Sequence, residues 1–167
     1  LDFNNIRRIT KLGYPRAESL PSPGFAAGPC LFKDTMQLVS YSKNNFHLGS
    51  SAMLVNEGLA LYVYEKLEKK YSKSLKNKNI GILGMAFKAE IDDTRSSLSY
   101  KLKKILYANC KKIMCHDPYV KNDKSLVSID DIKNNCQIII LCAPHKMYKK
   151  LKFKKNIYIL DIWDHIK

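Results

Sequence analysis

Short apolar runs and helical patterns alternate along the second half of the chain, from residue 79 to its end. One of these runs, residues 136–144, is a continuous apolar stretch, which is typical of strands in parallel sheets. The predicted strands cover residues 79–87, 111–118, 136–144 and 156–164. Between them, apolar residues recur at helical spacing, and the predicted helices cover residues 92–110, 128–135 and 145–151. The alternation predicts an α/β fold with a doubly wound, mostly parallel, Rossmann-like sheet.

The first half of the chain follows a different, helical pattern. Residues 1–29 contain many turn-forming Gly and Pro residues and are predicted to be irregular. One helix is predicted after Cys30, over 33–45, and a long one over 49–71 with apolar positions on more than one face. The long helix should be buried on two sides, and a second chain is a candidate for one of them. The polar stretch 72–79 is predicted to be a linker. Two domains follow, and they cover residues 1–75 and 76–167.

The composition is that of a globular protein. Hydrophobic residues make up 46% of the 167 residues, and Gly and Pro are few. No run of about 18 apolar residues is present, so no membrane span is expected. Five cysteines without a Cys-x-x-Cys pair, and four histidines without metal-binding spacing, indicate a reducing cytoplasm and no metal. The first residues are charged and begin no clear element, so the chain is expected to continue a longer protein.

The net charge of +14 has two interpretations. It can indicate an anionic partner, such as a nucleic acid or a phosphorylated ligand. It also fits a bias toward lysine on solvated surfaces, because only four of the 29 basic residues are arginines, the better phosphate ligands. No basic patch is interleaved with aromatic residues as in single-strand binders, so no nucleic acid partner is expected.

The stretch PSPGFAAGPCLFKD, residues 21–34, places one cysteine after a loop of small residues. Small residues let a ligand approach the backbone closely, and Lys33 lies about one helical turn from Cys30, where a cation increases thiol reactivity. Asp34 is placed to accept a proton or to orient a water molecule. This arrangement fits a nucleophilic cysteine. The alternative is a buried cysteine before a helix, with Lys33 and Asp34 on the solvent face.

The stretch GILGMAFKAEIDDTR, residues 81–95, follows the start of the first predicted strand. Its Gly-x-x-Gly-x-x-Phe differs from the dinucleotide-binding Gly-x-Gly-x-x-Gly, but a phosphate can still bind at the N-terminus of the next helix. Lys88 and Arg95 are predicted at the carboxyl edge of the sheet, where doubly wound folds bind ligands. The alternative is a tight strand–helix turn with a helix cap and an exposed lysine.

Taken in order, PGFAAGPCLFKD, VNEG and IGILGMAFKAEIDDTRSS closely resemble the UDP-glucose/GDP-mannose dehydrogenase family. These enzymes oxidise C6 of a nucleotide sugar to a carboxylate, using NAD. The resemblance covers the C-terminal half of such an enzyme, without the N-terminal NAD-binding domain. It implies a cytoplasmic protein that forms a homodimer through helix 49–70 and serves polysaccharide biosynthesis. The C-terminal DIWDHI lacks the Asp-Gly-Arg of some members, and so resembles members that act on UDP-N-acetylhexosamines.

The resemblance also implies roles for individual residues. Cys30 resembles the thiol that attacks the C6 aldehyde and holds a thiohemiacetal and then a thioester. Asp34 resembles the adjacent carboxylate that handles the hydrolytic water, and Lys33 the catalytic lysine near the cofactor. Arg95 resembles the arginine on the cofactor side. The residues that resemble substrate contacts are Arg16, which would reach the sugar of a neighbouring subunit, the loop residues Gly24, Phe25 and Gly28, and Lys88 at the diphosphate.

The cysteine loop departs from the family, because the usual Gly-Phe-Gly-Gly-Ser-Cys is here Gly-Phe-Ala-Ala-Gly-Pro-Cys, one residue longer. Two functional hypotheses remain. The first is the C-terminal portion of an NAD-dependent dehydrogenase that oxidises UDP-glucose or a UDP-N-acetylhexosamine, inactive without its NAD domain. The second is a non-catalytic module that binds a UDP-sugar or dimerises.

Overall fold

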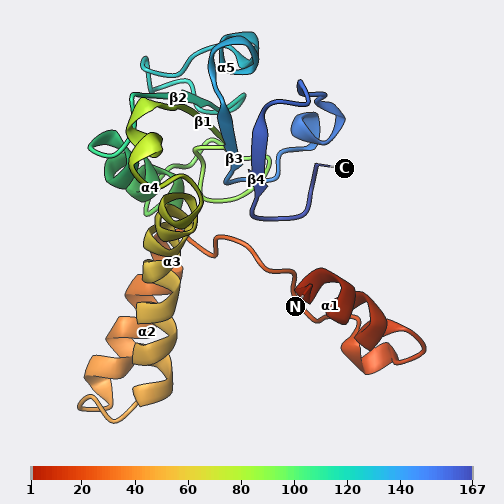
Figure 1. Cartoon of the computed structure of the whole chain (residues 1–167). Coiled ribbons are helices and arrows are strands. Elements are labelled where there is room, and N and C mark those ends of the chain that lie inside the picture. The colour runs from red at the N-terminus through yellow and green to blue at the C-terminus, as the bar shows by residue number, and fades with distance from the viewer. Residues whose placement is uncertain (1, 167) are drawn as a thin grey trace.

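A computed structural model gives the structure of residues 2–166, with helices in the first half of the chain and a sheet domain in the second (Figure 1). The α-helices are α1 (Phe3–Lys11), α2 (Pro29–Tyr41), α3 (His47–Tyr71), α4 (Leu98–Tyr107) and α5 (Ile129–Asn135). The 3₁₀ helices are η1 (Pro15–Ala17), η2 (Ser72–Asn77) and η3 (Lys146–Lys150). The strands are β1 (Asn79–Leu83), β2 (Lys112–His116), β3 (Ile138–Leu141) and β4 (Tyr158–Asp161).

The strands form one parallel sheet in the order β2–β1–β3–β4. The chain runs from β1 out to β2 and then crosses back to β3 on the other side of β1, which is the doubly wound order. On one face, Ile80 and Ile82 of β1 join a core cluster with Leu102 of α4. On the other face, Leu83 packs with Ile132 of α5. Burial on both faces explains the apolar runs and confirms the predicted fold class.

The predicted long helix is confirmed as α3, which packs against two other helices, α2 and α4. Near its start it runs beside α2, and toward its end it packs against α4 on the face of the sheet (Figure 1). Its buried side chains include Met53, Val63 and Leu67. Other apolar side chains of α3 are exposed, namely Leu48, Leu54, Val55, Leu61 and Tyr62. The helix is therefore amphipathic only in part, and a second chain on the exposed side stays a prediction.

The prediction that residues 1–29 are irregular was wrong at α1 and η1. The Asp2 carboxylate accepts a hydrogen bond from the Asn5 backbone N–H at 3.0 Å and caps α1. The apolar residues Phe3, Ile6 and Ile9 follow at helical spacing, although all three are exposed. Residue 1 lies outside the described residues.

Helix α2 begins earlier than predicted, at Pro29 rather than after Cys30. Proline is favoured at the first position of a helix, because its missing N–H has no partner there in any case. Gly28 precedes it as the N-cap, with a φ of 124° that a side chain rarely permits. Cys30 consequently lies in the first turn of α2.

Two further boundaries differ from the sequence prediction. Residues 92–97 form a loop, and α4 starts at Leu98 because Ser97 caps it by accepting the Ser99 N–H. The predicted linker is instead the short helix η2. The helix α5 is confirmed, with a reciprocal capping box between Ser128 and Asp131. No helix within residues 2–166 is long and apolar enough to span a bilayer.

Candidate functional site

The loops that follow the strands meet at the carboxyl edge of the sheet, because all strands are parallel. The segment after β1, residues 84–97, carries Lys88 and Arg95. Its turn begins at Gly84, whose φ is +88° and whose Cα faces Ala143, the second residue after β3. This is the edge at which doubly wound folds bind ligands, so the topology places both basic residues where they were predicted.

Asp117, the first residue after β2, is buried beneath this edge and accepts hydrogen bonds from its loops. Its carboxylate is fully buried and accepts the backbone N–H groups of Met85 at 2.7 Å and Ala86 at 2.9 Å. Its other oxygen accepts the N–H groups of Tyr119 and Val120 at 2.9 and 3.2 Å. Burial alone would raise the pKa of Asp117, but hydrogen bonds from His145 and these N–H groups hold it at about 2. The buried carboxylate is therefore ionised and ties the β1 loop to the β2 loop.

His145, in the loop after β3, is fully buried next to Asp117. Its Nε2 lies 3.0 Å from the Asp117 carboxylate, and its Nδ1 accepts the backbone N–H of Glu90 at 2.9 Å. Because Nδ1 accepts, the proton of the neutral ring must be on Nε2, which donates to Asp117. One imidazole thus joins the loops after β1, β2 and β3.

The loop before Cys30 packs onto the same edge. The Phe25 side chain is 4% exposed and belongs to the main core cluster. A Cβ added to Gly24 would lie 2.3 Å from the Trp163 ring, in the loop after β4, and one added to Gly28 would lie 2.9 Å from the Phe87 ring. Trp163 is itself held by an Nε1–H hydrogen bond to the Cys142 carbonyl at 2.8 Å. Because these two glycines have no side chain, the two aromatic rings pack directly on the backbone of the loop before Cys30.

Cys30 is exposed in the first turn of α2, so the alternative of a buried cysteine is wrong. Lys33 and Asp34 are also exposed, and the Lys33 ammonium lies 3.3 Å from the Asp34 carboxylate. The peptide dipoles of α2 favour negative charge at this end of the helix. The other cysteines are less accessible, and three of them are buried: Cys115, Cys136 and Cys142.

Arg95, in the β1 loop, is paired with Asp93. Its guanidinium donates to the Asp93 carboxylate at 2.7 Å from Nη2 and 3.0 Å from Nε. These bonds raise the pKa of Arg95 above its usual value, and the negative charge of a Cys30 thiolate adds a smaller increase. The two side chains thus lie within electrostatic reach, although they are far apart in the sequence.

The structure separates one predicted residue from the others. Arg16 lies in η1, beside α1, and that part of the chain stands away from the sheet (Figure 1). Phe25 is buried in the main core cluster, so the structure assigns it a packing role. The remaining predicted residues gather around the carboxyl edge and the start of α2: Gly24, Gly28, Cys30, Lys33, Asp34, Lys88 and Arg95.

Sequence reasoning missed Asp117, His145, Glu90 and Trp163. Asp117 and His145 could have been found from the sequence, because each is a polar residue that follows a predicted strand within a few positions. Residues there in parallel sheets converge at one edge. Among residues 2–166, no group of three or more His, Cys, Asp or Glu side chains is arranged to hold a metal ion.

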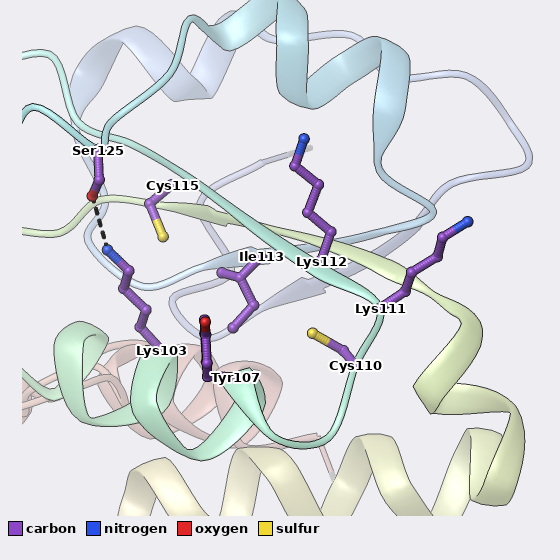
Figure 2. A pocket seen from close by; sticks show the side chains of 8 residues that line it. All are labelled: Lys103, Tyr107, Cys110, Lys111, Lys112, Ile113, Cys115 and Ser125. Carbon is purple, nitrogen blue, oxygen red and sulfur yellow. Dashed lines mark hydrogen bonds between the residues drawn. The ribbon is translucent and has the colours of Figure 1, made fainter.

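A basic hollow of about 580 Å³ lies between α4 and the outer strand β2 (Figure 2). Lys103 points to Ser125, with 3.0 Å between Nζ and Oγ, whereas Lys111 and Lys112 extend in other directions. Because the ammonium groups diverge, this hollow has no common point at which an anion would meet them.

Comparison with known proteins bears on this arrangement. Residues 81–166 match the UDP-glucose/GDP-mannose dehydrogenase family, UDP binding domain. The match covers just over half of the chain, begins in β1 and includes the loops that follow the four strands, but not the loop before Cys30. The chain therefore belongs to the UDP-glucose/GDP-mannose dehydrogenase family, which confirms the resemblance seen in its motifs.

Two relatives are UDP-N-acetyl-D-mannosamine dehydrogenases. The enzyme of Methanocaldococcus jannaschii is 32% identical, with 90% of this chain and 39% of the relative covered. The enzyme of Pyrococcus horikoshii is 30% identical, with 84% and 34% covered. These matches fit the UDP-N-acetylhexosamine branch. The chain spans between a third and two fifths of the length of these relatives.

Solved structures agree with the fold. The UDP-D-ManNAc dehydrogenase of Pyrococcus horikoshii superposes with a TM-score of 0.83 at 25% identity, covering 100% of this chain and 41% of that one. A UDP-glucose dehydrogenase of Pyrobaculum islandicum gives the same TM-score at 20% identity, covering 99% and 41%. The second match shows a shared fold only.

Proposed function

We propose that this chain is the C-terminal portion of an NAD-dependent nucleotide-sugar 6-dehydrogenase that oxidises a UDP-sugar, either UDP-glucose or a UDP-N-acetylhexosamine. The observation that carries the proposal is the meeting of two motifs. The Phe87 ring, in the β1 loop, packs on Gly28, two residues before the exposed Cys30. This contact keeps the β1 loop, which also carries Lys88 and Arg95, beside the loop of Cys30. A nucleophile beside a phosphate-binding edge is what oxidation of a nucleotide sugar at C6 requires.

The nucleotide diphosphate is proposed to bind at the carboxyl edge. Lys88 is exposed there and carries a cation that no residue in the described part of the chain pairs within 4.0 Å. A charge-assisted contact between a lysine and a phosphate oxygen is stronger than a hydrogen bond between neutral groups. The loop of Gly24, Phe25 and Gly28 packs on the same edge, and we propose that it contacts the sugar.

Cys30 is proposed to add to the C6 aldehyde and to hold first a thiohemiacetal and then a thioester. We propose that Asp34, which lies one helical turn along α2, orients the water that hydrolyses the thioester. Lys33 and Arg95 are exposed cations near Cys30, which fits a ligand with two phosphates, and we propose that they lie beside NAD. NAD would supply the hydride acceptor.

The alternative is a module that binds a UDP-sugar without catalysis, and the Cys30→Ser variant of the longer enzyme separates it from the first proposal. If Cys30 is the nucleophile, this variant forms no uronic acid while still binding the nucleotide sugar. Unchanged acid formation would contradict the nucleophile assignment. We further propose a cytoplasmic homodimer built on α3, with Arg16 reaching the site of the neighbouring subunit.

The experiment on the chain itself is a calorimetric titration with UDP-N-acetylglucosamine, UDP-glucose and GDP-mannose. We expect a UDP-sugar to bind, and Lys88→Ala to weaken it by about 10- to 100-fold through loss of one charge-assisted bond. Lys104→Ala is the matched control, because Lys104 is an exposed lysine near the far end of α4. Equal affinities for wild type and Lys88→Ala would contradict the proposed diphosphate site.

A further inference from the structure

Glu90 has a backbone conformation that its side chain disfavours. Its φ is +62°, in the left-handed region where residues other than glycine are uncommon. A residue keeps such a conformation only when its surroundings enforce it, and such strain collects at functional sites. Glu90 lies two residues after Lys88, in the loop that we propose binds the diphosphate.

Three interactions enforce this conformation. The Glu90 N–H donates to His145 Nδ1 at 2.9 Å. One carboxylate oxygen accepts the Lys146 N–H at 2.8 Å, and the other accepts the Tyr119 hydroxyl at 3.0 Å. The backbone of Glu90 is thus tied to the loop after β3, and its side chain to the loops after both β2 and β3.

The other end of the loop is held by Asp117, which accepts the N–H groups of Met85 and Ala86. Asp117 and Glu90 meet through His145, whose two ring nitrogens bond one to each. The segment 85–90 is therefore fixed at both ends to a single buried unit. Between those ends lie Phe87, whose ring packs on Gly28, and the exposed Lys88.

We propose that Asp117, His145 and Glu90 are positioning residues that fix the segment 85–90, so that Lys88 and the Cys30 loop keep one relative placement. The proposal rests on the function proposed above, because it assigns these residues to the binding of the diphosphate. None of the three needs to touch the ligand. His145 and Asp117 are buried, and their effect reaches the site through the backbone of residues 85–90.

The spectroscopic test uses nitrogen NMR of His145 in the whole chain. The arrangement requires a neutral ring with the proton on Nε2 and a bare Nδ1, and the two nitrogens then have distinct chemical shifts. Observation of the Nδ1–H tautomer would overturn the proposed link to Glu90, because Nδ1 would then be unable to accept the Glu90 N–H.

The functional test uses Tyr119→Phe, which removes only the hydroxyl that holds the Glu90 carboxylate. Tyr64→Phe is the matched control, because it removes a similar bond, to Glu68 at 2.8 Å, on the surface of α3. We expect Tyr119→Phe to weaken UDP binding by about three- to tenfold while uridine binding, followed by chemical-shift titration, is unchanged. His145→Phe should weaken UDP further, and if it fails to fold, Tyr119→Phe decides.

Amide hydrogen exchange separates failure of this inference from failure of the proposed function. We expect faster exchange at Met85, Ala86 and Glu90 in Tyr119→Phe and not in Tyr64→Phe. If the wild type binds no UDP, the proposed function fails. The amide exchange rates alone then test whether Asp117, His145 and Glu90 fix the segment 85–90. Unchanged exchange, or an equal loss of UDP and uridine affinity, would overturn the positioning role.

Discussion

The substitution Asp117→Asn makes the sharpest test of how the carboxyl edge is built. The side chain is fully buried, and its oxygens accept from five donors: the N–H groups of Met85, Ala86, Tyr119 and Val120, and Nε2 of His145. Asparagine has nearly the same shape, but one of its two terminal groups is a donor. In either orientation the amide nitrogen faces N–H groups, so some donors lose their acceptor.

The magnitude follows from the pKa of Asp117, which falls from 3.8 to about 2 on folding. A carboxyl group with a lowered pKa stabilises the fold at pH values above its unfolded pKa. That stability is lost as the pH falls through the folded pKa. At 1.36 kcal/mol for each pH unit, the ionised Asp117 contributes about 2 kcal/mol at pH 7, and about half of this is lost at pH 3. Asparagine cannot ionise and has no such dependence.

The assay is urea unfolding of wild type and Asp117→Asn between pH 7 and pH 3. We expect the free energy of unfolding of the variant to be lower by about 2 kcal/mol or more at pH 7. The gap should narrow by about 1 kcal/mol at pH 3. A gap that stays constant over this range would refute the ionised, N–H-bound Asp117.

Two further predictions follow from the cysteine loop and α3. Gly28→Ala should lower the free energy of unfolding by about 2–4 kcal/mol, because it combines a positive φ with a Cβ 2.9 Å from Phe87. Gly58→Ala should raise the free energy of unfolding by about 0.5–1 kcal/mol, because Gly58 lies in the interior of α3 with open space around it. Urea unfolding of the two variants measures both changes, which should have opposite signs. In the folded chain an alkylating reagent followed by mass spectrometry should modify Cys30 first, since it is exposed, and equal labelling of all five cysteines would contradict the structure.

The positions of the strands could be predicted, but their ends could not. After Asn79 the run up to residue 87 has no polar side chain, yet β1 stops at Leu83 because Gly84 turns the chain. Met85 and Ala86 are buried like strand residues, but their N–H groups bond to Asp117 instead of to a neighbouring strand. Helix α1 was missed because turn-forming residues around it outweighed the cap at Asp2 in the sequence pattern.

The exposed groups of the site could be found from motifs, and the buried groups that hold them could not. Cys30, Lys88 and Arg95 belong to contiguous stretches with recognisable chemistry. The link between His145 and Glu90 joins residues from different loops, and only the order of the strands brings those loops together. A hydrogen bond between residues so far apart in the sequence cannot be predicted from the sequence pattern until the order of the strands is known.

The central claim is that a uridine diphosphate binds at the carboxyl edge, and amide chemical-shift mapping tests it most directly. UDP is titrated into the nitrogen-15-labelled chain, and the shifted amides are located. We predict that they cluster at the loops after β1, β3 and β4, around Lys88, His145 and Trp163. Shifts confined to the basic hollow of Lys103, Lys111 and Lys112, or no shifts at millimolar UDP, would contradict the account.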